Sequence, residues 1–453
     1  MLDVIKLKKG FDINIVGEAN KSIMSSADKV TSYLIKSTDF NYLTPKLLVK
    51  EGDSVKAGTP LFYDDNNNRI VITSPVSGIA SKIKNSESIK EICISPTETI
   101  DYVNFDIPSL DTIKSEEVKE AMLTSGLWAF IRQRPFDSIA NPDDIPKIIL
   151  VSAFDTNPMA PDYDFIVHKQ DKYFQTGIDI LNKLNNSKIY LTVHQTRTFS
   201  NVFFNTKNVE IITFDGKHPS GNISVQIHHI SPLSKNEVIW YVNPQDVITI
   251  GKFFTHGVYD ATKIITIAGS EINCTGYHKI IAGASIESLV KDNIKENSNP
   301  RYISGNVLTG KQIEKNGYIG FYDNLVSVIP EGNTSEVLGW AKLGTQKYSF
   351  WHSFFSWMMP TKQYPLNTNY HGEKRALIFT EQFADVFPMT IMPAQLIKSC
   401  IVGDMEDMED LGIYEVAPED FAICEYIDPS KTEIQEIIKN ALDKVRLIWI
   451  SQH

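Results

Sequence analysis

The strongest constraint on the fold comes from four short, almost uninterrupted apolar runs. They span residues 148–151, 189–193, 209–212 and 238–242. Runs of this length without polar alternation are typical of strands that are buried on both faces of a parallel sheet. Segments with helical periodicity lie between them. Strands that alternate with helices predict a Rossmann-like α/β domain, which we place at residues 106–258.

The first hundred residues contain short β-rich runs separated by turn residues. Gly52 and Gly58 lie where tight turns between strands need a permissive backbone. The pattern around them, repeated at residues 74–78, resembles the barrel-sandwich fold of biotinyl and lipoyl carrier domains, and we assign it to residues 1–105. Those carriers place a lysine seven residues before the small residue of their turn. The corresponding residue here is Asn67, so we expect a scaffold module and no swinging-arm role.

Two further units follow in the chain. The order strand, turn at Gly269, helix-like segment and strand suits a small β-grasp (SLBB-like) domain at residues 259–335. Residues 336–453 are expected to form a mostly helical C-terminal domain. The last helix has one apolar face, made of Ile434, Ile437, Ile438, Ala441, Leu442 and Val445. Ser430 and Glu433 suggest a capping box at its start. The chain is therefore predicted to be an α/β multidomain protein.

Composition narrows the classes of function. The 453 residues include 44 lysines and arginines against 55 acidic residues, a net charge of −11, which argues against a nucleic-acid partner. No window has the roughly 18 apolar residues that a membrane-spanning helix needs, and no secretory signal follows the initial methionine. The four cysteines are far apart, so we expect no disulfide framework and a reduced, cytosolic protein.

Common catalytic and metal-binding motifs are missing. The sequence has no Walker A motif, no G-x-G-x-x-G and no C-x-x-C, so neither a four-cysteine zinc site nor an iron–sulfur cluster can be built from this chain alone. The pair His228-His229 alternates with apolar residues, which favours a half-exposed strand edge over a metal site. The acidic residues 404–410 are expected to be a solvated helix face. We therefore predict no catalytic residue and no metal ligand.

Residues 118–130 and the later strand that runs into Asp155-Thr156-Asn157-Pro158 resemble the flavin subunit of respiratory complex I. In that family a glycine-rich loop follows Ser-Gly-Leu and lets backbone amides approach the flavin phosphate. Here the loop reads Trp128-Ala129-Phe130-Ile131-Arg132-Gln133-Arg134-Pro135-Phe136. Because bulky side chains replace the glycines, we expect the ancestral FMN site to be lost.

Residues 412–430 resemble the ferredoxin-like end of the RnfC-type electron-transport subunits, which carry four cluster-binding cysteines. The four ligand positions here are Pro418, Phe421, Cys424 and Asp428. A cluster needs about four such ligands. The iron–sulfur site is therefore also expected to be lost.

Several blocks in order are similar to the A subunits of the bacterial Na⁺-translocating NADH:quinone oxidoreductases. They are residues 5–13, 127–136, 155–158, 240–247, 301–305 and 327–332. The resemblance implies a peripheral subunit on the cytoplasmic face of the inner membrane, without a transmembrane helix. It implies five partner subunits, B to F, foremost the membrane-embedded B subunit and the flavin-carrying C subunit. NADH, FAD, FMN, riboflavin and Fe–S belong to those other subunits, and this chain has no tightly bound cofactor.

The family has been linked to quinone, and the vacated flavin loop has suitable groups for it. A quinone needs aromatic walls and one or two donors for its carbonyls. Trp128, Phe130 and Phe136 are candidate walls, and Arg132 and Arg134 are candidate donors. The alternative is that the aromatics fill the old flavin pocket and the arginines form salt bridges, in a purely structural scaffold subunit.

The most aromatic stretch, residues 348–360, is a candidate docking surface for a membrane subunit. Ordinary core is the default interpretation of such a run. It combines tryptophan, phenylalanine and methionine, which are favoured in partner interfaces. The candidate docking residues are Phe350, Trp351, Phe354, Phe355 and Trp357.

Overall fold

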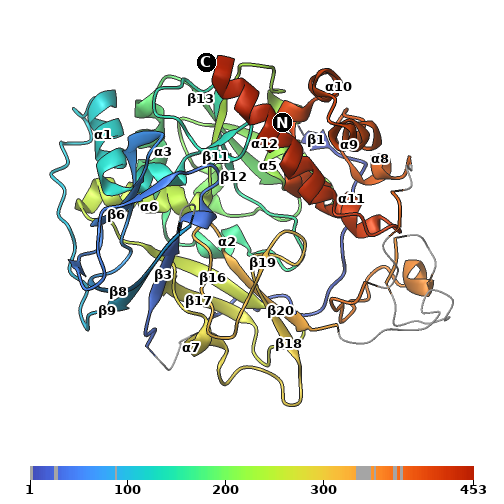
Figure 1. Cartoon of the computed structure of the whole chain (residues 1–453), viewed down its shortest axis with the longest axis horizontal. Coiled ribbons are helices and arrows are strands. Elements are labelled where there is room, and N and C mark those ends of the chain that lie inside the picture. Colours follow the sequence, from blue (N-terminus) through green and yellow to red (C-terminus); the bar gives the residue numbers. More distant parts are fainter. Residues whose placement is uncertain are drawn as a thin grey trace.

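The computed structural model describes residues 4–24, 29–86, 89–332, 348–350, 354–370, 375–377 and 381–452. It consists of a β-sandwich, an α/β unit, a second mixed sheet and a cluster of helices at the C-terminal end (Figure 1). This is the multidomain architecture that the sequence predicts.

The N-terminal sandwich packs a four-stranded sheet and a three-stranded sheet. The first has the order β3 (Tyr33–Lys36), β9 (Lys90–Pro96), β8 (Gly78–Asn85) and β5 (Ser54–Val55). The second has the order β4 (Pro45–Leu47), β6 (Pro60–Asp64) and β7 (Asn67–Thr73). Gly52 and Gly58 both have φ of +94°, the left-handed conformation that the two predicted turns require.

The α/β unit contains the four predicted buried strands side by side and parallel. The sheet has the order β1 (Val4–Lys6), β14 (Glu210–Asp215), β13 (Lys188–His194), β12 (Ile148–Ser152), β15 (Ile239–Val242), β10 (Arg132–Arg134) and β11 (Ser138–Ile139). Only β10 and β11 run antiparallel to their neighbours in this sheet. The chain order reverses at β12, because β13 lies on one side of it and β15 on the other.

Helices cover both faces of this sheet. They are α1 (Ser115–Ser125), α2 (Tyr163–Ile166), α3 (Asp171–Leu184), α4 (Asn201–Phe204), α5 (Ile223–Ile230) and α6 (Pro244–His256). Ile149 and Val151 of β12 face α3, α6 and the core shared with the sandwich, whereas Ile148 and Leu150 face α5 and the C-terminal helices. Both faces are buried, which explains the uninterrupted apolar runs.

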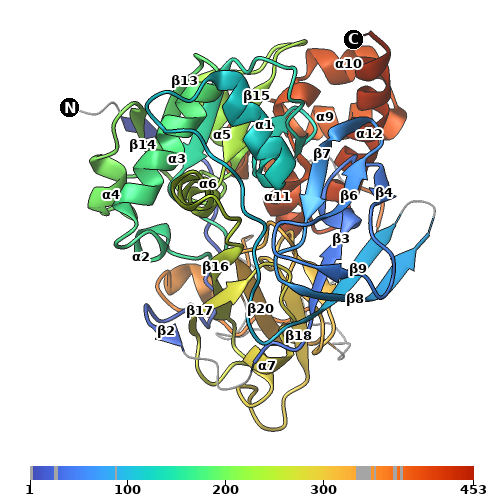
Figure 2. The ribbon, with the colours of Figure 1, turned by 90° about the vertical axis from the view of Figure 1, so that its left-hand side faces the viewer.

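The β-grasp-like unit is built on a six-stranded sheet that lies below the α/β unit in Figures 1 and 2. Its order is β19 (Lys311–Ile313), β18 (Pro300–Ser304), β20 (Leu325–Pro330), β16 (Thr262–Ala268), β17 (Gly276–Ile281) and β2 (Ile23–Met24), with α7 (Glu287–Val290) beside it. Two short strands from the start of the chain, β1 and β2, thus belong to sheets of other units.

The C-terminal region is helical in its described part. It contains α8 (Phe383–Val386), α9 (Pro393–Val402), α10 (Met405–Asp410), α11 (Ala422–Ile427) and α12 (Ile434–Gln452). Three short 3₁₀ turns accompany these helices, at Phe355–Met358, Ile413–Glu415 and Pro418–Phe421. The predicted apolar face of α12 is confirmed, since Ile434, Ile438 and Leu442 are buried.

Two local predictions were wrong. The Oγ atom of Ser430 is buried and makes no hydrogen bond to a described residue, and α12 begins at Ile434, so Ser430 does not cap it. His228 and His229 lie on helix α5 and not on a strand edge. His228 Nδ1 lies 2.8 Å from Glu415 Oε2 and His229 Nε2 lies 2.7 Å from the Pro388 carbonyl oxygen, so both rings bind the C-terminal region. Ile227 and Ile230, which flank the pair, pack into the core that α5 shares with the C-terminal helices.

Candidate functional site

A cavity of about 240 Å³ lies at the carboxyl ends of β12 and β15. These two strands flank the point where the strand order reverses, the place where open α/β sheets hold their ligands. The lining residues come from the α/β sheet and its loops, the six-stranded sheet and the C-terminal region. The polar and aromatic ones include Phe130, Arg132, Phe154, Asp155, Asn157, Tyr163, Asn222, Tyr241, Asn243, Asp246, Asn306, Tyr322, Asp323, Asn324 and Glu419.

Arg132 is the cationic side chain of this wall. It extends from β10, and its guanidinium forms an ion pair with Asp137. The same guanidinium lies over the ring of Tyr322, with Cζ 4.4 Å from the ring centroid. Desolvation by burial lowers the pKa of Arg132, but the interactions with Asp137, Tyr241 and Tyr322 together outweigh it and the pKa is raised. Arg132 therefore remains a cation with a fixed orientation.

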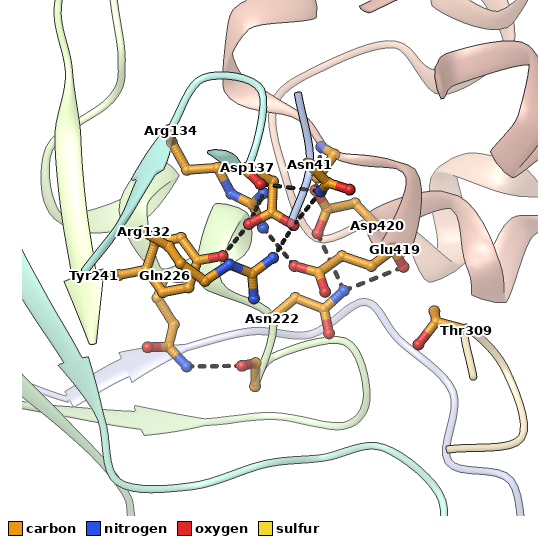
Figure 3. A network of polar contacts seen from close by, with 12 residues as sticks. Asn41, Arg132, Arg134, Asp137, Asn222, Gln226, Tyr241, Thr309, Glu419 and Asp420 are labelled. Carbon is orange, nitrogen blue, oxygen red and sulfur yellow. Dashed lines mark hydrogen bonds and ion pairs between the residues drawn. The ribbon is translucent and has the colours of Figure 1, made fainter. Parts of the chain in front are cut away.

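Arg134 lies behind Arg132 and is only 2% exposed. Its NH1 is 3.0 Å from Asp137 Oδ1 and its NH2 is 2.6 Å from Glu419 Oε1. Tyr241 donates its hydroxyl proton to Asp137 as well, so one carboxylate connects three side chains (Figure 3). A buried charge is tolerated only when it is paired in this way. Arg134 serves the packing between the α/β unit and the C-terminal region.

The C-terminal region closes the cavity through the 3₁₀ turn Pro418–Phe421. Asn222 Nδ2 donates to Asp420 Oδ1 at 3.1 Å, and Asp420 Oδ2 accepts from the Ala417 amide at 2.8 Å. This brings Glu419 to the cavity wall, where 39% of its side chain is exposed. The segment that resembles a ferredoxin-like end thus contributes Glu419 to the lining of the cavity.

Two carboxyl groups of the wall have strongly shifted pKa values. Desolvation by burial raises the pKa of Asp246 to about 7, although the charges of Lys263 and Arg132 lower it. Desolvation also raises the pKa of Glu419 to about 7, against the lowering effect of Arg134. Carboxyls that titrate near neutrality inside a cleft are typical of ligand and catalytic sites.

The structure divides the five residues predicted to surround a quinone. Phe130 and Arg132 line the cavity. Trp128 is fully buried, donates from Nε1 to the Ala140 carbonyl oxygen at 2.8 Å and packs edge-on against Trp240. Arg134 and Phe136 are also buried, and Phe136 packs against Tyr414 and Trp449 of the C-terminal region. Three of the five therefore lie in the core, outside the cavity wall.

The sequence reasoning missed Asp246, Tyr241, Tyr322 and Glu419. Asp155 and Asp246 did carry a signal, since each follows closely after a buried parallel strand and such strand ends meet at one edge of the sheet. Tyr322 and Glu419 carried none, because they reach the cavity from separate units.

Four of the five predicted docking residues belong to the described residues. Phe350 packs edge-on against Phe11, with ring centroids 5.1 Å apart. Phe354 is half-buried, whereas Phe355 and Trp357 are exposed. Trp351 lies outside the described residues. A separate open hollow of about 530 Å³ between α9 and α12 is lined by C-terminal residues such as Cys400 and takes no part in the strand-end cavity.

Within the described ranges, no group of three or more His, Cys, Asp or Glu side chains could hold a metal ion. Cys424 is fully buried, and burial raises the pKa of its thiol. No helix in the same ranges is long and apolar enough to cross a membrane.

Comparison with known proteins gives consistent results along the chain. Three family descriptions match in order: the NqrA N-terminal barrel-sandwich hybrid domain at residues 5–96, the NqrA second alpha/beta domain at 113–259 and the NQRA C-terminal domain at 264–315. A solved NAD⁺-reducing [NiFe]-hydrogenase in its H2-reduced state aligns with a TM-score of 0.39 and 12% identity over 78% of this chain and 68% of its own, too weak for any argument.

Curated relatives align over nearly their full length. The A subunit of the Na(+)-translocating NADH-quinone reductase of Yersinia pestis bv. Antiqua is 32% identical over 98% of this chain and 99% of its own. The proteins of the same description from Tolumonas auensis and Neisseria meningitidis serogroup B are 32% and 31% identical, over 98% of this chain and 100% and 99% of theirs. This chain therefore belongs to the family of the A subunits of the Na⁺-translocating NADH-quinone reductases.

Proposed function

We propose that the chain is a peripheral subunit at the cytoplasmic face of a membrane complex that couples NADH oxidation and quinone reduction to sodium export. Its partners are the five subunits B to F, above all the membrane-embedded B subunit and the flavin-carrying C subunit. NADH, the flavins and the iron–sulfur centre belong to those partners, and this chain supplies no catalytic residue. Family membership supports the proposal.

The second part of the proposal is that the cavity at the strand ends holds a quinone head group. The observation that carries it is the position of Arg132, a fixed cation on an aromatic wall formed by Phe130, Tyr241 and Tyr322. Its guanidinium is a donor for a quinone carbonyl. A cavity of 240 Å³ is below the usual range for drug-sized ligands, so it suits one ring.

The loss of the ancestral cofactor sites is also part of the proposal. Trp128 and Phe136 pack into the core where the related flavin proteins have bare glycines. At the other site, Asp428 accepts hydrogen bonds from the Ser430 and Thr432 amides, which is a turn-forming role. Both arrangements are self-sufficient without a cofactor.

The docking surface stays a proposal for Phe355 and Trp357, whose side chains are 38% and 55% exposed. Large exposed aromatic side chains are favoured as interface anchors. Phe350 and Phe354 are more buried and would support this surface from behind.

The quinone site is tested by titrating the full chain with a tail-less benzoquinone and following the heat of binding. Arg132→Gln removes the cation while keeping an amide, and we expect the Kd to rise about tenfold or more, since a hydrogen bond from a charged donor is worth roughly 1.5–3 kcal/mol. Arg69→Gln is the matched control, because Arg69 pairs with Asp143 outside the cavity.

The same two variants are then assembled into the whole complex and the KM for quinone is measured. An unchanged KM in Arg132→Gln, or no saturable binding to a folded full chain, contradicts the quinone site. Either result favours the alternative of a scaffold subunit that does not contact quinone.

A further inference from the structure

The cavity has an unequal supply of hydrogen-bond donors and acceptors. Most of its donors are already used by neighbouring protein groups. Tyr322 donates its hydroxyl proton to the Ala129 carbonyl oxygen at 2.7 Å, and Tyr241 donates to Asp137. Asn243 Nδ2 donates to the Tyr163 hydroxyl at 2.6 Å. The donors left for a ligand are Arg132 and the hydroxyl of Tyr163, which has no acceptor among the described residues.

Several acceptors of the lining are unused, although side-chain oxygens of Asp155, Asn243, Asn306 and Asp323 already accept from protein groups. Among the described residues, neither carboxylate oxygen of Asp246 accepts a hydrogen bond, and the same holds for the side-chain oxygens of Asn157, Asn222 and Asn324. None of these oxygens is fully buried without a partner, and all four residues line the cavity. A ligand that fills this space must supply protons to them, because a buried acceptor without a partner costs free energy.

The charges of the lining also favour a ligand that donates hydrogen bonds. Arg132 shares the lining with four carboxyl groups, those of Asp155, Asp246, Asp323 and Glu419. Asp246 and Glu419, with pKa values of about 7, carry only part of a negative charge near neutrality, but the carboxyl groups still outnumber the one cation of the lining. The lining therefore disfavours phosphate esters and other anions and admits a neutral ligand with hydroxyl groups. The aromatic rings of Phe130 and Phe154 select a flat ring among such ligands.

We propose that the cavity prefers the reduced, dihydroxybenzene form of the quinone over the oxidised form. A quinone offers two carbonyl acceptors and no donor, whereas a quinol offers two hydroxyl groups. Each hydroxyl can donate to an oxygen such as those of Asp246 and also accept from Arg132. The inference rests on the proposed quinone site and adds the redox state of its ligand.

The test compares three ligands with one ring, titrated anaerobically into the full chain. They are 2,3-dimethoxy-5-methyl-1,4-benzoquinone, its hydroquinone, and the dimethyl ether of that hydroquinone, which keeps the ring but has no donor. We expect the hydroquinone to bind at least about tenfold more tightly than the other two, because a site built around a hydroxyl group rejects analogues that lack it.

Asp246→Asn supplies the second arm, titrated at about pH 8.5, where the Asp246 carboxyl with its pKa of about 7 is ionised. The variant keeps the size of the side chain and exchanges one acceptor for a donor. The hydroquinone affinity is expected to fall about tenfold, while the quinone affinity stays the same or rises. Asp292→Asn, at an exposed aspartate that does not line the cavity, is the matched control and leaves both affinities unchanged. Circular dichroism and the melting temperature show whether each variant is folded.

Equal or tighter binding of the quinone by the unmodified chain overturns the preference but leaves the proposed quinone site intact. Failure of the full chain to bind either form overturns both. Because the three-ligand comparison uses the unmodified chain, it decides the question even if Asp246→Asn does not fold.

Discussion

At the scale of single residues, Asp137 organises the cavity wall. Its carboxylate pairs with the guanidinium groups of Arg132 and Arg134 and accepts the hydroxyl proton of Tyr241. Glu419 supplies the second negative charge for Arg134, from a different part of the chain. Removing one member of such a buried set leaves an uncompensated charge and typically costs about 3–5 kcal/mol.

The shifted carboxyls predict how stability depends on pH. The pKa values of Asp246 and Glu419 are about 7 in the folded chain, against ordinary values of 3.8 and 4.5. The folded chain therefore binds these protons more tightly, and their contribution to stability is lost as the pH rises from the ordinary pKa values through 7. Buried histidines with lowered pKa values, such as His194 and His218, act in the opposite sense below pH 6.5.

Asp246→Asn isolates one of these groups, because the amide does not titrate. The melting temperature of the variant minus that of the unmodified chain should rise from about pH 3.8 to pH 7 and level off above, since only the unmodified chain loses the stabilising proton. Thermal unfolding followed by circular dichroism measures it. Asp292→Asn, which removes an exposed carboxylate outside the cavity, is the matched control. Equal profiles for both variants would contradict the shifted pKa of Asp246.

The sequence predicts which side chains are bulky or charged at this scale, but not which residues of the folded chain each one contacts. The sequence shows that the side chains from Trp128 to Phe136 are bulky. It does not show that the Trp128 indole donates to the Ala140 carbonyl oxygen and packs on Trp240, or that Arg132 lines the cavity. Glu419 reaches Arg134 from 285 residues away in the chain. No local pattern contains that information.

At the scale of elements, the helices α3 and α6 approach each other unusually closely. A Cβ atom on Gly177 would lie 2.1 Å from the Val247 carbonyl oxygen, and one on Gly251 would lie 1.9 Å from the Tyr173 carbonyl oxygen. Each helix thus presents a glycine to the backbone of the other. Periodicity predicts a helical segment at α3, but the need for these glycines follows only from the packing of the two helices against each other.

Gly251→Ala is therefore expected to destabilise the chain even though alanine is the better helix former. The gain in helix propensity is about 1 kcal/mol, and the overpacking costs about 1–3 kcal/mol plus the shift of a backbone that cannot yield. Denaturant unfolding measures the difference. The control is Lys172→Ala, at an exposed position of α3, which should change the free energy of unfolding by less than about 0.5 kcal/mol. A Gly251→Ala protein as stable as this control would contradict the close approach of α3 and α6.

At the scale of the whole molecule, the units are tied together at their cores. One continuous core includes Ile35 of the sandwich, Ile149 of the α/β sheet and Ile267 of the six-stranded sheet. A second joins the other face of the α/β sheet to α12. The order of units was predictable from sequence because each has its own periodicity, whereas the placement of β1 and β2 in distant sheets was not.

Deleting residues 1–7 should lower the melting temperature and promote self-association. The deletion removes β1, which pairs in parallel with β14 through Val4–Lys6, and so uncovers the edge of the α/β sheet. Exposed strand edges template pairing with other chains. Light scattering after gel filtration measures the self-association. Deletion of residues 451–453, at the other end of the chain, is the control. A monomeric protein with an unchanged melting temperature would contradict the role of β1 in covering the sheet edge.

The remote partners of β1 and β2 also govern the order in which the protein can mature on the ribosome. β1 has no strand neighbour until residues 210–215 have been synthesised, and β2 has none until residues 276–281 have followed. At about 5–20 residues per second, the leading segment waits roughly 10–50 s for its partners. Nascent chains of this protein therefore carry the backbone of β1 and β2 without these strand partners during that interval.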